Sequence, residues 1–193
     1  RCWKIPLWWG LDKGVRTVGV RCGTTGYAGA SRSRSAEIGT GDGTGKGGSM
    51  KKQLINECTL RFPSRSVNEG FARSTAAAFI AQLDPNLEQL YDIKTAVSEA
   101  VTNCIVHAYR DTAGEILIDV KLCEGRMVQI EIRDRGCGIE DVKRAREPLF
   151  TTDAEGERSG MGFTVMESFC DGVRVSSRVG KGTTVTLLKR LHK

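Results

Sequence analysis

Metal-binding and membrane-spanning patterns are both missing from this sequence of 193 residues. Its seven cysteines include no Cys-x-x-Cys pair, which argues against a zinc site. No apolar stretch approaches the length of a membrane span, and the initial RCWKIPLWWG is too short and too broken for a signal peptide. We therefore expect a cytoplasmic protein whose cysteines are reduced and buried.

A basic surface is also missing from most of the chain, although the net charge is +6. Residues 1–49 hold eight Lys and Arg against three Asp and Glu, so five of the six net charges lie there. Residues 50–193 hold 21 basic and 20 acidic side chains. Because these charges nearly cancel, residues 50–193 have no electrostatic basis for binding nucleic acid.

The chain divides at Ser49/Met50 into two regions of different composition. Residues 1–49 contain all three tryptophans and 12 of the 23 glycines, without helical or strand periodicity. Met50 is the first methionine, and the codons of residues 46–48 can read as a ribosome-binding sequence. We hypothesise that residues 1–49 are an unstructured or non-native extension, translated from upstream sequence, and that the native protein begins at Met50. The alternative is a genuine disordered extension.

The glycine-rich stretch GTGDGTGKGGSM, residues 39–50, is not a P-loop. That motif needs a glycine five places before its Gly-Lys pair and Ser or Thr after the lysine. Here Thr40 and Gly47 occupy those positions around Gly45-Lys46. The stretch is typical of a flexible linker or tail, so a phosphate site is expected elsewhere.

Residues 50–193 alternate between strand-like and helix-like patterns. A first strand is predicted at 54–62 and a helix at 66–83, with Ser66 and Glu69 forming a capping box. A longer helix is predicted at 86–109. Its expected apolar stripe consists of Leu87, Leu90, Tyr91, Val97, Val101, Cys104, Ile105 and Ala108.

Four later segments show the alternation of half-buried strands: 115–122, 127–134, 172–178 and 183–190. Short links make the first two a predicted antiparallel hairpin and the last two a second pair. With one apolar face per strand, the sheet is expected to be covered on one side only. The predicted fold class is α+β: a two-layer sandwich of a mixed, mostly antiparallel sheet with helices on one face.

Chemistry-bearing residues fall into four groups along this pattern. Glu99, Asn103 and His107 are spaced to share one face of the long helix, and a carboxylate with an amide one turn apart suits metal-nucleotide chemistry. Alone, this spacing is also common on solvated helix faces. Next, Asp134 follows a strand in RDRGCGI, where Gly136 and Gly138 permit a close backbone approach.

The third group is ERSGMGFTVMESF (157–169), in which Gly160 and Gly162 open a helix whose N-terminus can hold an anion. The polar run 151–159 before it is predicted to be a mobile lid. The fourth group is Gly182-Thr183-Thr184, where Thr183 shares the parity of the inward residues of its strand.

In this order, the groups resemble the ATP-binding fold shared by gyrase, Hsp90, histidine kinases and MutL. The segments SEAVTNCIVHAY, IRDRGCGI, PLFTT and ERSGMGFTVMESF are similar to the anti-sigma F factors of spore-forming bacteria, serine kinases of that superfamily. The resemblance spans about the whole of 50–193 and does not reach 1–49.

The resemblance implies a role for each matching residue. Glu99 would be the general base toward a serine hydroxyl, and Asn103 would ligate Mg²⁺. Asp134 would bind the adenine amino group of ATP, with Thr183 nearby through water. The remaining implied contacts are Gly136 and Gly138 to the adenine pocket, and Arg158, Gly160 and Gly162 to the phosphates.

The resemblance also implies protein partners. These are a sigma factor, held inactive by a homodimer, and an anti-anti-sigma protein that is phosphorylated on serine. Arg73 is a candidate partner contact. The alternative function is a nucleotide-gated sigma-binding module without kinase activity. A histidine kinase is disfavoured because no long helical hairpin presents His107 or His192.

Overall fold

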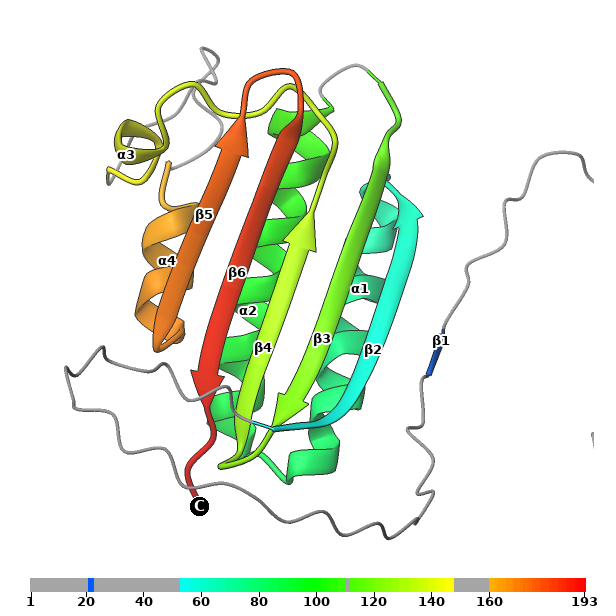
Figure 1. Cartoon of the computed structure of the whole chain (residues 1–193), viewed down its shortest axis with the longest axis vertical. Helices are drawn as coiled ribbons and strands as arrows, with labels where there is room; N and C mark the ends of the chain where they lie inside the picture. Colours follow the sequence, from blue (N-terminus) through cyan, green and yellow to red (C-terminus); the bar gives the residue numbers. More distant parts are fainter. Residues whose placement is uncertain (1–20, 23–52, 110–111, 148–159) are drawn as a thin grey trace, which may run out of the picture.

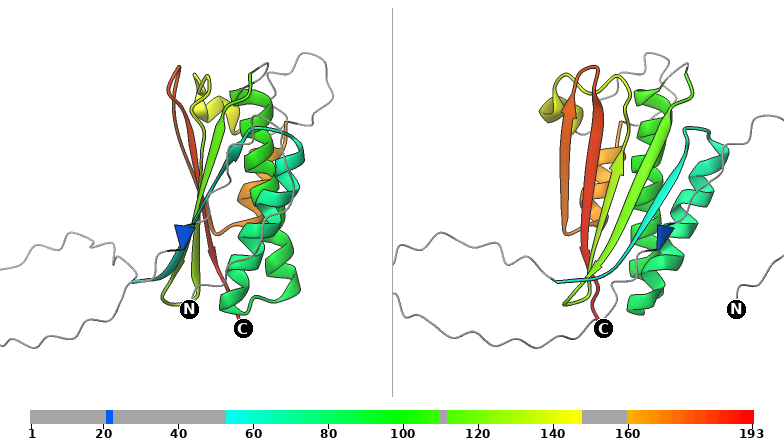
Figure 2. Two further views of the ribbon diagram at one scale, coloured as in Figure 1. Left: turned by 90° about the vertical axis from the view of Figure 1, so that its right-hand side faces the viewer. Right: turned by 45° about the vertical axis from the view of Figure 1, so that its right-hand side comes forward.

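The computed structural model describes residues 21–22, 53–109, 112–147 and 160–193. It shows a sheet with helices packed on one face, which confirms the predicted α+β sandwich (Figures 1 and 2). The predicted boundary at Ser49/Met50 and the run 151–159 lie outside the described residues. The strands are β1 (Arg21–Cys22), β2 (Leu54–Pro63), β3 (Glu115–Cys123), β4 (Met127–Arg133), β5 (Gly172–Arg178) and β6 (Gly182–Arg190). The helices are α1 (Val67–Ile80), α2 (Leu87–Asn103), α3 (Val142–Ala145) and α4 (Gly162–Phe169).

The sheet has the order β1-β2-β3-β4-β6-β5, and all of its described pairs are antiparallel. Both predicted hairpins, β3–β4 and β5–β6, are confirmed. The pairing of β4 with β6 places Arg133, the last residue of β4, opposite Thr184. Residues that follow β4 therefore lie beside the start of β6, although about fifty positions separate them in the chain.

Alternating side chains of the central strands build the core against α1 and α2. Residues Ile118, Val120 and Ile132 are fully buried on the helix side of the sheet. Small side chains such as Ala76 and Ala100 are also fully buried on the two helices. Each strand has one buried face, so a one-residue shift in strand register would expose the buried isoleucine and valine side chains of that strand. Their burial therefore fixes the register.

The predicted capping box of the first helix is wrong. Ser66 has helical backbone angles and makes no side-chain capping bond. Glu69 instead accepts hydrogen bonds from Arg73 Nη1 at 2.7 and 2.9 Å and from Ser98 Oγ of α2 at 2.6 Å. The carboxylate is thus engaged by a neighbouring helix, and α1 ends at Ile80 in a short 3₁₀ turn, Ala81–Leu83.

The predicted stripe of the second helix is wrong at its beginning and correct further along. Leu87 and Tyr91 are 87% and 66% exposed, whereas Val97, Val101 and Cys104 are buried. The α-helix also ends earlier than predicted, at Asn103, and continues as a π-helical turn over Cys104–Ala108. Such wide turns occur often at functional sites, and this one borders the cavity described below.

A largely buried ion pair fixes the C-terminal end of α4. Lys189 Nζ of β6 donates to Asp92 Oδ2 of α2 at 2.9 Å and to the carbonyl oxygen of Phe169, the last residue of α4, at 2.7 Å. Both charged side chains are about one-sixth exposed. One ammonium group therefore joins α2, α4 and β6, and it satisfies a carbonyl that the end of a helix leaves unpaired.

We expect Lys189→Met to lower the free energy of unfolding by about 2 kcal/mol. This is somewhat less than the roughly 3–5 kcal/mol typical of a fully buried pair, because water still reaches both partners. Urea denaturation would measure the change. Lys181→Met, in the exposed β5–β6 turn, is the matched control and should have almost no effect. Equal effects of the two substitutions would contradict the stabilising role of the pair.

Candidate functional site

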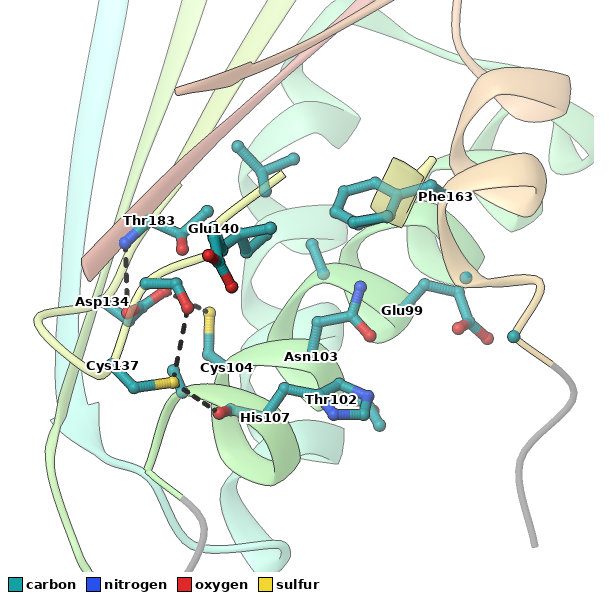
Figure 3. Close-up of a pocket in the computed structure, with 18 of the residues that line it drawn as sticks. Glu99, Thr102, Asn103, Cys104, His107, Asp134, Cys137, Glu140, Phe163 and Thr183 are labelled. Atoms are coloured by element: carbon teal, nitrogen blue, oxygen red, sulfur yellow. Dashed lines mark hydrogen bonds between the residues drawn. The ribbon is translucent and has the colours of Figure 1, made fainter. Parts of the chain in front are cut away.

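A cavity of about 860 Å³ lies between α2, α4 and the loop that follows β4. This volume is within the range of small-molecule sites, about 300–1,000 Å³. Asp134, Cys104 and Thr183 lie on one side of the view in Figure 3, and Glu99 lies on the other side beside the start of α4. The site therefore has two ends with different chemistry.

Asp134 forms the floor of the first end. It is only 7% exposed, and its Oδ1 accepts hydrogen bonds from the backbone N–H groups of Gly136 at 2.9 Å and Thr183 at 3.2 Å. Its Oδ2 is contacted by the Cys104 thiol at 3.7 Å. Burial raises the pKa of Asp134, and these three donors oppose the rise. Oδ1 is thus engaged by the protein, while Oδ2 retains lone pairs for a ligand.

The thiol of Cys104 remains protonated in this setting. Burial, with the charge of Asp134 as the next cause, holds its pKa well above the ordinary value. The protonated sulfur can therefore donate to Asp134 Oδ2. A second cysteine, Cys137, is exposed at the cavity, and its Sγ lies 3.1 Å from the carbonyl oxygen of His107.

Two glycines allow the loop after β4 to close tightly against its neighbours. A Cβ atom on Gly136 would lie 2.2 Å from the carbonyl oxygen of Ala108. Gly138 has a φ of +74°, and a Cβ there would lie 2.3 Å from the carbonyl oxygen of Arg178. No side chain fits at either position, so the sequence DxGxG is required to place this loop along the cavity.

Glu99 and Asn103 form the second end, where α4 begins. A Cβ on Gly162 would lie 3.1 Å from Glu99 Oε2 and 3.4 Å from the Asn103 amide. The first residue of α4 therefore sits directly against these two side chains, and Figure 3 shows Glu99 beside the start of that helix. The early N–H groups of a helix have no partner within it and attract anions. A carboxylate, an amide and a helix N-terminus consequently meet at one place.

Thr183 and Ser177 extend the polar floor from the β5–β6 side. Thr183 is 9% exposed, as its strand parity predicted, and its Oγ1 lies 2.9 Å from Ser177 Oγ. Ser177 Oγ also accepts from the backbone N–H of Ile139 at 2.7 Å and lies 3.2 Å from the Gly182 carbonyl oxygen. One serine hydroxyl thus connects β5, β6 and the loop after Gly138.

The comparisons with known proteins agree with this geometry. Residues 62–189 match the model of the histidine kinase-like ATPase domain. The chain is 58% identical over 141 residues to the anti-sigma F factor of Anoxybacillus flavithermus, covering 72% of this chain and 96% of that one. The chain belongs to the anti-sigma F factor family. The anti-sigma F factor of Geobacillus kaustophilus is 54% identical over 140 residues, with the same two shares covered.

A solved structure supports the fold of this anti-sigma F factor family member. The RsbU and RsbW domains of a Mycobacterium tuberculosis protein align with a TM-score of 0.51 and 22% identity, covering 70% of this chain and 33% of that one. At this identity the likeness shows the fold alone. The match to an ATPase domain implies that the chain binds ATP.

The structure brings together most of the residues selected from the sequence. Those that line the cavity are Glu99, Asn103, Asp134, Gly138, Gly160, Gly162 and Thr183, and Gly136 supports its wall. Arg158 and the segment PLFTT lie outside the described residues. Arg73 lies elsewhere, on α1, where it pairs with Glu69.

Sequence reasoning did not assign Cys104, Cys137 or Ser177 to the site. Both cysteines were expected to be buried, which is correct for Cys104 and wrong for Cys137, which is exposed. Cys104 directly follows Asn103, and Cys137 lies within DxGxG. Their positions within the motifs were the available signal. In the described part of the chain, no three His, Cys, Asp or Glu side chains are grouped as a metal site, and no helix is long and apolar enough to cross a membrane.

Proposed function

We propose that this protein is an anti-sigma factor that uses ATP and Mg²⁺ to phosphorylate its anti-anti-sigma antagonist on serine. The observation that carries the proposal is the meeting of Glu99, Asn103 and the first residue of α4 in the same cavity as Asp134. One end of the cavity suits an amino-bearing base, and the other suits phosphates next to a proton acceptor.

The floor of the cavity fits adenine. Asp134 and Thr183 both line the cavity. Because Oδ1 of Asp134 already accepts two backbone N–H groups, Oδ2 is the oxygen that would accept from a base. The exocyclic amine of adenine is a donor, so it complements a carboxylate oxygen. Gly136 and Gly138 let the loop after β4 pack directly against the backbone of Ala108 and Arg178, which would set the position of this wall beside the base.

The α4 end fits the phosphates and the metal ion. Gly160 and Gly162 precede or open a helix of eight residues, whose first N–H groups would face the phosphates together with Arg158. Asn103 would hold Mg²⁺ through its amide oxygen. Mg²⁺ usually takes only one or two protein ligands and completes its shell with phosphate oxygens and water, so a single amide beside a carboxylate suffices. The ion would neutralise charge on the phosphates.

Glu99 supplies the chemistry that the substrate serine requires. Its carboxylate accepts the hydroxyl proton while the serine oxygen bonds to the γ-phosphorus of ATP and the bond to the bridging oxygen breaks. The products are phosphoserine and ADP, and the proton remains on Glu99 until it passes to solvent. Phosphoryl transfer depends mainly on positioning and charge stabilisation, so few residues are needed.

The partners follow from the family. The relatives are named as anti-sigma F factors, so we assign to this chain a sigma factor as its target, a homodimer as its acting form, and the cytoplasm as its location. Arg73 is our candidate for a sigma-factor contact. Its side chain is 41% exposed on α1 and is oriented by the ion pair with Glu69.

The test is transfer of label from γ-labelled ATP by the full chain, with Mg²⁺ and a purified anti-anti-sigma protein. Label on a serine of that protein supports the proposal. ATP binding and sigma-factor binding without transfer of label would instead assign a nucleotide-gated sigma-binding module without kinase activity. Omitting Mg²⁺ should abolish transfer.

A further inference from the structure

The direction of the hydrogen bonds around Ser177 determines what the floor of the cavity can offer a ligand. Ser177 lies on β5, opposite Thr183 of β6, and its side chain contacts three polar groups. A serine hydroxyl has one proton to donate and two lone pairs. The three contacts therefore leave little freedom in where each proton lies.

Only one arrangement makes all three contacts into hydrogen bonds. The N–H of Ile139 can only donate, so it occupies one lone pair of Ser177 Oγ. The Gly182 carbonyl oxygen can only accept, so it receives the Ser177 proton. The contact with Thr183 is then a bond in which Thr183 donates. In the reverse arrangement, Ser177 and the Gly182 carbonyl would be two acceptors facing each other without a proton between them, which is unfavourable.

The consequence is a floor that accepts hydrogen bonds and donates none. Because its proton points toward Ser177, Thr183 Oγ1 presents lone pairs to the cavity that it lines. Asp134 Oδ2 presents lone pairs as well, and the proton of Cys104 is directed at that oxygen. Adenine carries an amine at the position where hypoxanthine and guanine carry a carbonyl oxygen. Such a floor binds the amine and repels the carbonyl.

We propose that Ser177 is a specificity-determining residue: by holding the Thr183 proton away from the cavity, it restricts the site to nucleotides with an exocyclic amine. The inference rests on the proposed ATP site and adds a residue that itself does not line the cavity. Ser177 is thus a positioning residue, acting through Thr183.

The experiment compares the dissociation constants of ATP and inosine triphosphate for the wild-type chain and for Ser177→Ala, by calorimetry with Mg²⁺. Without Ser177, the Thr183 hydroxyl can turn its proton into the cavity and donate to the inosine carbonyl. We expect the preference for ATP over inosine triphosphate to narrow by about tenfold, the size of a single hydrogen bond. Ser176→Ala, on the opposite face of β5 and exposed, should keep the wild-type ratio.

The ratio of the two dissociation constants separates an effect on nucleotide specificity from a general effect on the structure of the site. Weaker binding of both nucleotides by the same factor in Ser177→Ala would overturn the inference while leaving the ATP site intact. Failure of the wild-type chain to bind ATP would overturn the proposed function and the inference with it. If Ser177→Ala does not fold, Thr183→Val serves instead. Thr183→Val should narrow the preference for ATP over inosine triphosphate, and Thr183→Ser should retain that preference. An unchanged ratio in Thr183→Val would also overturn the inference.

Discussion

Replacing Glu99 with Ala or Gln is expected to lower the rate of serine phosphorylation by about 10²–10⁴, while ATP still binds. This loss is typical of removing a general base and corresponds to roughly 3–5 kcal/mol of activation free energy. The carboxylate lies at the α4 end of the cavity, away from the floor that would hold adenine. Its removal should therefore affect transfer far more than nucleotide affinity.

Single-turnover transfer from labelled ATP, measured beside the dissociation constant of ATP, would separate the two effects. Glu88→Gln is the matched control, because Glu88 is an exposed carboxylate in the first turn of the same helix. It should retain the wild-type rate. If Glu99→Gln transfers phosphate at the wild-type rate, Glu99 is not the base. If it loses ATP binding as well, Glu99 instead shapes the start of α4.

The central strands could be predicted from the sequence because burial on one face imposes a strict alternation. Ile118, Val120, Ile130 and Ile132 show that pattern and are buried as expected. The same parity correctly directed Thr183 inward. Local periodicity was sufficient here because the core buries one face of each of these strands.

The helix ends could not be predicted in this way, because their partners are distant in sequence. Glu69 has the position that the capping pattern requires, but its carboxylate accepts a hydrogen bond from Ser98 of the neighbouring helix instead. Leu87 and Tyr91 have the spacing of a buried stripe but are exposed, whereas Gln89 and Ile93 at the same end of α2 are buried. A pattern within one helix does not reveal which face its neighbours cover.

The candidate site was predictable where its residues lie in short motifs and not where they meet across strands. Asp134 could be selected because it ends a strand and precedes two glycines. Ser177 could not, because its contacts depend on the β5–β6 register and on Ile139, 38 positions away. The further inference therefore depends on a residue that only the folded chain identifies.

Asp134→Asn is expected to weaken ATP binding by about 10- to 150-fold, equivalent to roughly 1.5–3 kcal/mol for a hydrogen bond to a charged group. The asparagine oxygen can keep the bonds from the N–H groups of Gly136 and Thr183. Its amide nitrogen would then face the cavity as a donor and oppose the adenine amine. By the same reasoning, protonation of Asp134 should weaken ATP binding as the pH falls through its raised pKa.

The effect of the same substitution on stability should have the opposite sign. The pKa of Asp134 is raised in the folded chain, so the unfolded chain releases this proton at lower pH than the folded chain does. Asp134 therefore lowers the free energy of unfolding as the pH rises from the pKa of Asp134 in the unfolded chain toward its pKa in the folded chain. Above both pKa values this loss of stability is complete. Asparagine does not titrate, so Asp134→Asn should melt at a higher temperature than the wild-type chain at pH 7, and the difference should shrink in acid. A variant that binds ATP weakly and also melts lower at pH 7 would contradict this account, because it would show that the charged carboxylate stabilises the fold.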